Sequence, residues 1–212
     1  MTMRPFGQLI TDDFLVSTKP QTEAPARPCT AGERMVAAAA REIRDGEMVF
    51  VGMRLPMLAF LVAHRTHAPT AIALYENGVI REEPAPELLY TMADPPNLLG
   101  ATLCGSMLDV MGLLQQGRVQ VGFLGAAEVD RMGNLNSTWG SRDGQQIRLP
   151  GSGGACDIAC LAQRAVVLLG HDRRRLVERV QHITSPGFGS GNSWRRAQGL
   201  PARSGPSAVI TT

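Results

Sequence analysis

The chain has 212 residues, of which 44% are hydrophobic and 19% are charged, with a formal net charge of +2. These values are typical of a globular protein with one sizeable core. Only 5% of the residues are aromatic and the basic residues are interspersed with acidic ones, so we expect no nucleic-acid partner. No apolar run approaches the roughly 18 residues of a membrane-spanning helix, and the N-terminus lacks the apolar core of a signal peptide. We therefore expect a cytoplasmic protein without a membrane partner.

The first 29 residues differ in composition from the rest of the chain. Residues 1–29 are rich in proline, threonine and charge, which favours an extended or disordered N-terminal arm. The predicted folded domain comprises residues 30–212. It begins with Thr30-Ala-Gly-Glu33, a capping box in which the two side chains exchange hydrogen bonds with each other's backbone amides. This motif predicts a helix that starts at residue 30 and continues, by its apolar spacing, to Ile43.

The remainder of the chain alternates short β-rich runs with helical patterns. Strands are predicted at 48–51, 71–75, 119–124 and 165–169, and helices at 57–63, 106–116 and 156–164. This alternation predicts an α/β fold with an open, mostly parallel sheet flanked by helices. After a glycine-rich loop over residues 187–205, a last strand begins at Pro206 and the sequence stops at Thr212. Because domains seldom end inside a strand, this strand is either a sheet edge or the chain is C-terminally shortened.

A carboxylate stands where the second strand stops. The apolar run from Ala71 ends in Glu76-Asn-Gly78, and Asn77-Gly78 is a strong turn signal because both residues tolerate positive φ. Open α/β sheets bind ligands outside the carboxyl ends of their strands, so Glu76 is a candidate reactive group. The alternative is that Glu76 is an ordinary solvated turn residue.

A second glycine-rich segment precedes the helix predicted at 156–164. Gly151, Gly153 and Gly154 place backbone amides near a helix N-terminus, where they could bind an anion or an oxyanion. The segment is neither a Walker loop nor GxGxxG, and a glycine-rich turn of this kind is more often structural. In contrast, the polar loop Asp130–Thr138 lacks the ligand set of a calcium loop and is interpreted as turn chemistry.

Metal binding is not predicted either. The four cysteines form no Cys-x-x-Cys pair, and the spacing of Cys156 and Cys160 is that of two small apolar residues on one side of a helix. His64 and His67 lie three residues apart with no further ligands to complete a metal set, so we expect structural or surface roles for both.

Several short motifs, taken in order, resemble one known family. They are Gly52-x-x-Leu-Pro56, Glu76-Asn-Gly78, Gly125-Ala-Ala-Glu-Val-Asp130, Gly133-Asn-Leu-Asn-Ser-Thr138, Gly151-Ser-Gly-Gly-Ala155, Ile183-Thr-Ser-Pro-Gly187 and Gly199-Leu-Pro201 with Gly205–Thr211. Over roughly residues 30–212 the chain resembles the β subunit of family I CoA-transferases, most of all the glutaconate CoA-transferase type. Seven motifs in order are far more specific than any one of them.

The resemblance implies both an activity and a partner. It implies an open α/β subunit that pairs with a homologous α subunit, with the active site between them and CoA esters and carboxylic acids as substrates. Glu76 matches the family's nucleophile, which carries acyl and CoA groups in covalent, ping-pong catalysis without a permanently bound cofactor. The other expected substrate- or CoA-binding residues are Asn77, Gly78, Gly153, Gly154, Ala155 and Arg54. Gly78 is expected to leave room for the acyl group.

Two positions depart from the family pattern. Arg54 stands where the family has glycine, so we expect its guanidinium to intrude near the site or to pair with a substrate carboxylate. Glu128 replaces a glutamine, without a consequence that the sequence reveals. Two alternative functions stay open: a CoA-thioester hydrolase or decarboxylase on the same fold, and an inactive shortened paralogue that acts as a binding subunit.

Overall fold

The computed structural model describes residues 28–142, 144–191, 193–201 and 203–212. The predicted N-terminal arm, residues 1–29, therefore lies outside the described part except for its last two residues. The domain bounds of 30–212 remain a prediction. In the described part of the chain, no helix is long and apolar enough to cross a membrane.

The first helix, α1 (Ala31–Arg41), begins where the capping box predicts. The Glu33 amide donates to the Thr30 hydroxyl over 3.2 Å, and the Thr30 amide donates to the Glu33 carboxylate over 2.7 Å. The predicted apolar face is buried against the sheet, with Ala39 and Ala40 almost inaccessible to solvent. The N-terminus of the helix and its packing were thus both predictable from the sequence.

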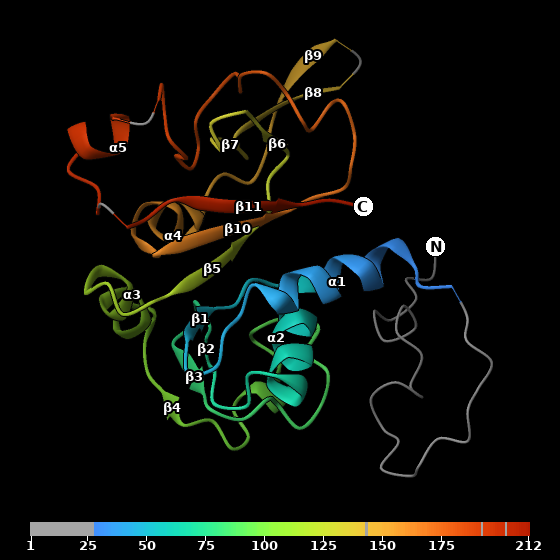
Figure 1. Ribbon diagram of the computed structural model, residues 1–212, viewed down its shortest axis with the longest axis vertical. Helices are drawn as coiled ribbons and strands as arrows, with labels where there is room; N and C mark the ends of the chain where they lie inside the picture. Colours follow the sequence, from blue (N-terminus) through green and yellow to red (C-terminus); the bar gives the residue numbers. More distant parts are fainter. Residues whose placement is uncertain (1–27, 143, 192, 202) are drawn as a thin grey trace.

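A seven-stranded sheet in the order β11-β10-β5-β1-β2-β3-β4 forms the centre of the domain (Figure 1). Its strands are β1 (Met48–Phe50), β2 (Ile72–Leu74), β3 (Val79–Arg81), β4 (Leu103–Cys104), β5 (Val121–Leu124), β10 (Arg164–Leu168) and β11 (Pro206–Ile210). The strands from β11 to β2 are all parallel, whereas β3 and β4 are each antiparallel to the preceding strand. The prediction of an open, mostly parallel sheet is confirmed.

Helices cover both faces of this sheet. The helices besides α1 that pack on it are α2 (Leu55–Thr66), α3 (Met107–Gln115) and α4 (Ala155–Leu161). One core joins α1 and α2 to inward-facing side chains such as Val49 and Tyr75, and the other joins α3 and α4 to Phe50 and Leu74. Figure 1 shows α1 and α4 on opposite sides of β10 and β11. Because side chains alternate along a strand, neighbouring residues of β2 face different helices.

Several short elements were not predicted from the sequence. They are the 3₁₀ turn η3 (Pro95–Asn97), the strands β6 (Glu128–Val129), β7 (Leu135–Asn136), β8 (Trp139–Arg142) and β9 (Gln145–Arg148), and the helix α5 (Trp194–Ala197). The expectation of an uninterrupted loop over 187–205 was therefore wrong, because α5 lies inside it. Helix α4 also ends at Leu161 rather than at Arg164, since Arg164 already pairs with Val121 of β5.

The polar loop after β6 has the turn chemistry that was expected. The buried Asp130 carboxylate accepts hydrogen bonds from the amides of Met132 and Asn134 and from the Asn134 side chain, over 2.9 to 3.0 Å. His64 and His67 are structural as well, because their Nε2 atoms lie 2.9 and 3.0 Å from backbone carbonyl oxygens. Within the described ranges, no group of three or more His, Cys, Asp or Glu side chains is arranged to hold a metal ion.

The open space beside Gly112 leads to a prediction about stability. Gly112 lies inside α3, and a Cβ atom placed on it would meet no other atom within 4 Å. Alanine restricts the unfolded chain more than glycine does, so Gly112→Ala should raise the free energy of unfolding by about 0.5–1 kcal/mol. Denaturant melts of the two proteins should show a higher midpoint for the variant. A lower midpoint would mean that the space beside α3 is not available to a methyl group.

Candidate active site

The turn after β2 places Glu76 at the carboxyl edge of the sheet. The Tyr75 amide donates to Val79 O and the Gly78 amide donates to Tyr75 O, both over 2.9 Å, so the chain reverses within four residues. Gly78 has a φ of +99°, as the Asn-Gly signal predicts. The turn leaves Glu76 half-buried and Asn77 exposed.

The glycine-rich segment before α4 contacts Glu76 directly. The backbone amide of Gly154 donates a hydrogen bond to Glu76 Oε1 over 3.1 Å. A Cβ atom on Gly154 would lie 3.0 Å from the same oxygen and 2.6 Å from Met111 Cε, and one on Gly153 would lie 3.8 Å from the oxygen. The structure thus brings Glu76, Gly153 and Gly154 together, and side chains at position 154 are excluded for steric reasons.

Two other predicted residues use their amides elsewhere. The Asn77 side-chain amide donates to Met92 O over 2.8 Å, and the Ala155 backbone amide donates to Ser152 O over 3.0 Å. These bonds fix the turn after β2 and the first turn of α4. The substrate-binding roles of Asn77 and Ala155 remain predictions.

The space beside Gly78 is filled by protein. A Cβ atom on Gly78 would lie 2.5 Å from the carbonyl oxygen of Gly105, whose amide in turn donates to Gly78 O over 3.0 Å. The expectation that Gly78 leaves room for an acyl group was therefore wrong. Its missing side chain instead allows the backbone before α3 to pack against the Glu76 turn, and its role in substrate binding remains a prediction.

The segment that packs on Gly78 is itself held by a second capping box. The Asp109 carboxylate accepts hydrogen bonds from the amide and hydroxyl of Ser106, over 2.7 and 2.8 Å, and these bonds lower the pKa of Asp109. The sequence carries a signal for this box, Ser106-x-x-Asp109, which sequence reasoning overlooked.

A buried arginine organises the loop on the other side of the turn. The Arg81 side chain is only 2% exposed and donates to Asn97 O and Glu83 O over 2.6 and 2.9 Å. The Asn97 side chain donates to Met92 O, the same carbonyl that Asn77 contacts. This connection supports the Glu76 turn from a loop that the sequence describes only as proline-rich.

Arg54 has an unusual backbone conformation. Its φ of 66° and ψ of −113° make it the one non-glycine residue with positive φ among those the structure describes. A conformation of this kind costs an L-residue on the order of 1–3 kcal/mol. Arg54 follows β1 and Glu76 follows β2, and these strands are parallel neighbours, so both residues belong to the same edge of the sheet.

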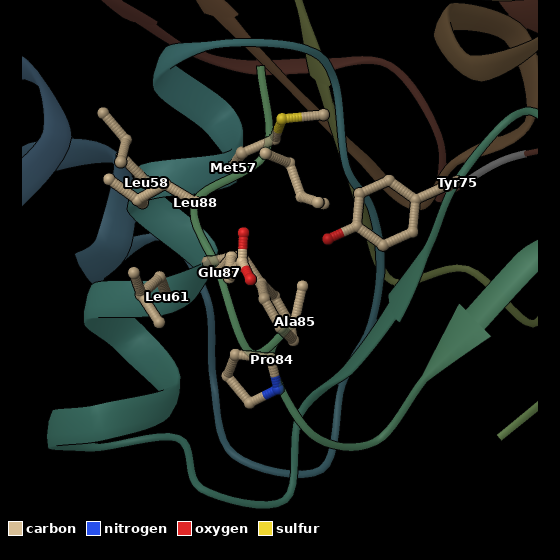
Figure 2. Close-up of a pocket in the computed structure, with 10 residues that line it drawn as sticks. Met57, Leu58, Leu61, Tyr75, Pro84, Ala85, Glu87 and Leu88 are labelled. Atoms are coloured by element: carbon tan, nitrogen blue, oxygen red, sulfur yellow. The ribbon is translucent and has the colours of Figure 1, made fainter. Parts of the chain in front are cut away.

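A small apolar pocket lies on the opposite face of the sheet from Glu76. It has a volume of about 30 Å³ and lies between α2 and the loop that contains Pro84 and Leu88. Figure 2 shows the Tyr75 hydroxyl pointing into it, toward Glu87. Burial raises the pKa of Tyr75 to about 12, so this hydroxyl stays protonated at neutral pH. Because Tyr75 and Glu76 are consecutive, their side chains point to opposite faces, and the pocket is separate from the Glu76 site.

The two cysteines of α4 lie just beyond the glycine-rich turn. As predicted, Cys156 and Cys160 are on the same helix, one turn apart. Burial raises the pKa of the Cys160 thiol to about 11, with Cys156 as a further cause. The Cys160 thiol therefore stays protonated near neutral pH and is a poor nucleophile.

Comparison with known proteins gives matches of one kind. The family model described as Coenzyme A transferase matches residues 32–200. One of the two subunits of the 3-oxoadipate CoA-transferase of Pseudomonas knackmussii is 39% identical over 184 residues, which cover 86% of this chain and 70% of that protein.

Solved structures show the same likeness. The crystal structure of glutaconate CoA-transferase from Acidaminococcus fermentans matches with a TM-score of 0.78 and 28% identity, over 86% of this chain and 72% of that chain. The decarboxylase AibA/AibB matches with a TM-score of 0.67 and 36% identity, over 74% and 67% of the two chains. Since the family model spans most of the sequence and the fold agrees with it, the chain belongs to the Coenzyme A transferase family.

Proposed function

We propose that the chain is the β-type subunit of a two-subunit CoA-transferase, and that Glu76 carries the acyl and CoA groups during turnover. The enzyme would act with a homologous α subunit and move CoA from an acyl-CoA to a carboxylic acid. The similar Pseudomonas protein is named as a subunit of its enzyme, which supports the partner. The proposed steps need only the carboxylate, the CoA ester and the acid, so they require no permanently bound cofactor. We propose a cytoplasmic location for this chemistry.

One observation carries the assignment of Glu76. Its carboxylate lies just past the end of a parallel strand, half-buried, with one oxygen on the Gly154 amide and the other oxygen available for chemistry. Glu82 and Glu83 follow the antiparallel strand β3 instead and are exposed. A carboxylate is a weak nucleophile, so it needs this kind of fixed position to reach a thioester carbon.

In the first half-reaction, CoA moves from the donor to the enzyme. A Glu76 carboxylate oxygen attacks the thioester carbonyl carbon, the C–S bond breaks, and CoA leaves as a thiolate. The product is a mixed anhydride between Glu76 and the donor acyl group. The thiolate then attacks the side-chain carbonyl carbon of Glu76, which releases the donor acid and leaves Glu76 as a CoA thioester.

In the second half-reaction, the acceptor acid reverses these steps. Its carboxylate attacks the Glu76 thioester carbon and expels CoA thiolate, which forms a second anhydride. The thiolate then attacks the acceptor acyl carbon. The acceptor leaves as its CoA ester, and Glu76 returns as a free carboxylate that retains one oxygen from the acceptor.

The Gly154 amide has a defined place in these steps. It contacts an oxygen of Glu76 itself, so it would stabilise the oxyanion that forms when the Glu76 carbonyl carbon is attacked. Two of the four steps pass through such an oxyanion. A backbone donor is suited to this role because it needs no reorientation as charge develops.

The alternatives make different predictions for Glu76. A decarboxylase or thioester hydrolase on this fold, for which the AibA/AibB structure is a precedent, would release carbon dioxide or free acid without a glutamyl adduct. An inactive binding subunit would form no adduct and support no turnover. The retained carboxylate at the end of β2 favours transfer over both alternatives.

Replacing the carboxylate tests the assignment. In the purified complex with the α-type subunit, Glu76→Gln should lower transfer from acetyl-CoA by at least about 10³-fold, because the amide keeps the size but removes the anionic nucleophile. The KM for the CoA ester should change little. Initial rates of both proteins with the same acceptor acid give the comparison.

Glu82→Gln is the matched control, since Glu82 is exposed and lies six residues further along the chain. It should transfer CoA at the wild-type rate. Near-normal activity of Glu76→Gln, or an equal loss in Glu82→Gln, would contradict the assignment.

Gly154→Ala tests the amide contact separately from the nucleophile. The backbone of Gly154, with φ of −74° and ψ of −3°, is allowed for alanine, so the added methyl group acts only through its contacts with Glu76 and Met111. Displacing the carboxylate from its donor should lower kcat by about 10²–10³-fold. Gly112→Ala, which adds the same methyl group where space is open, should keep wild-type kcat. Equal kcat values for the two variants would show that the Gly154 contact does not matter for turnover.

A further inference from the structure

The conformation of Arg54 is unfavourable for the fold in two ways. Its positive φ is a region that glycine, and not arginine, adopts readily. Arg54 is also the N-cap residue of α2, where its side chain makes no capping hydrogen bond, and a positive charge there opposes the helix dipole. A residue kept against two such costs points to a function outside the folding of the chain.

The position of Arg54 relative to Glu76 suggests what that function is. Phe50 pairs with Leu74 in the parallel register of β1 and β2, so Gly52 is level with Glu76 one strand away. Neighbouring strands are about 4.8 Å apart. Arg54 follows two residues later, its side chain is exposed, and Gly52 places no side chain between the two positions. A long side chain at 54 can therefore reach groups that are attached to Glu76.

The chemistry of the guanidinium selects one class of ligand. Arginine binds a carboxylate through two parallel hydrogen bonds, with geometry that a lysine does not reproduce. An acid whose first carboxyl group is joined to Glu76 presents a second carboxylate at its far end if it is dicarboxylic. The oxoadipate and glutaconate in the names of two similar proteins are acids of this class.

We propose that Arg54 is a specificity-determining residue that binds the distal carboxylate of a dicarboxylic acyl group while the proximal end is joined to Glu76. The enzyme thereby prefers dicarboxylic acids to monocarboxylic acids of the same length. This inference rests on the proposed function, because it needs an acyl group on Glu76.

The test compares two acids that differ only at the far end. The two-subunit enzyme is assayed with acetyl-CoA as donor and with glutarate or pentanoate as acceptor. Arg54→Gly should lower kcat/KM for glutarate by about 10- to 100-fold, the usual effect of losing a charge-assisted hydrogen-bond pair, and should leave pentanoate unchanged. Arg54→Lys should give an intermediate loss. Arg65→Ala removes an exposed arginine from the last turn of the same helix and should leave both acids unchanged.

The melting temperature provides an independent readout. Arg54→Gly relieves the backbone conformation and the unfavourable charge, so the variant should melt at a higher temperature than the wild type while it loses its preference for glutarate. A structural role for Arg54 would move both quantities in the same direction.

Two results overturn the inference while leaving the proposed function intact. One is an equal loss for glutarate and pentanoate, which would assign Arg54 to CoA or to general site structure. The other is an unchanged glutarate preference in Arg54→Gly. In either case, mass spectrometry should still find the adduct on Glu76 of the variant. A wild-type enzyme without that adduct would instead reject the proposed function, and this inference with it.

Discussion

The hydrogen bond between the Gly154 amide and Glu76 is the contact on which the site depends. It joins residues 78 positions apart in the sequence, so it forms only when β2 and the segment before α4 have both found their places on the sheet. Each partner has its own constraint. The Glu76 turn needs Gly78 against the backbone of Gly105, and position 154 tolerates no side chain because Glu76 and Met111 occupy the space. The fold thus holds a weak nucleophile in place with backbone groups, which need no rearrangement during the reaction.

The layers of the fold could be predicted from the sequence, because its central elements are long apolar patterns with clear ends. The Thr30 capping box, the buried runs of β1, β2, β5 and β10, and the Asn77-Gly78 turn all correspond to the structure. Strands β3 and β4 and the pair β8 and β9 were missed. They are two to four residues long, β4, β8 and β9 are largely exposed, and their pairing is decided by tertiary contacts that periodicity does not report.

The site was predictable in its residues and less so in its geometry. Glu76, Gly153 and Gly154 were singled out and lie together, whereas the space expected beside Gly78 is filled by the chain itself. The supports of the turn had weaker signals. Arg81 and Asn97 are polar residues in a proline-rich region, and nothing local indicates that they are buried and bonded to carbonyl groups. The strain at Arg54 was also hidden, because φ depends on the whole path from β1 into α2.

The most direct test of the central claim follows oxygen from the acceptor acid to Glu76. In the proposed cycle each acceptor leaves one carboxylate oxygen on the enzyme, so an acceptor labelled with ¹⁸O should transfer label to Glu76. Trypsin cleaves after Arg65 and Arg81, and in the peptide 66–81 Glu76 is the one side-chain carboxylate. After turnover in the two-subunit enzyme and digestion in ordinary water, mass spectrometry should find ¹⁸O in this peptide and none in the peptide that begins at Glu82. Turnover that leaves peptide 66–81 unlabelled would contradict the account.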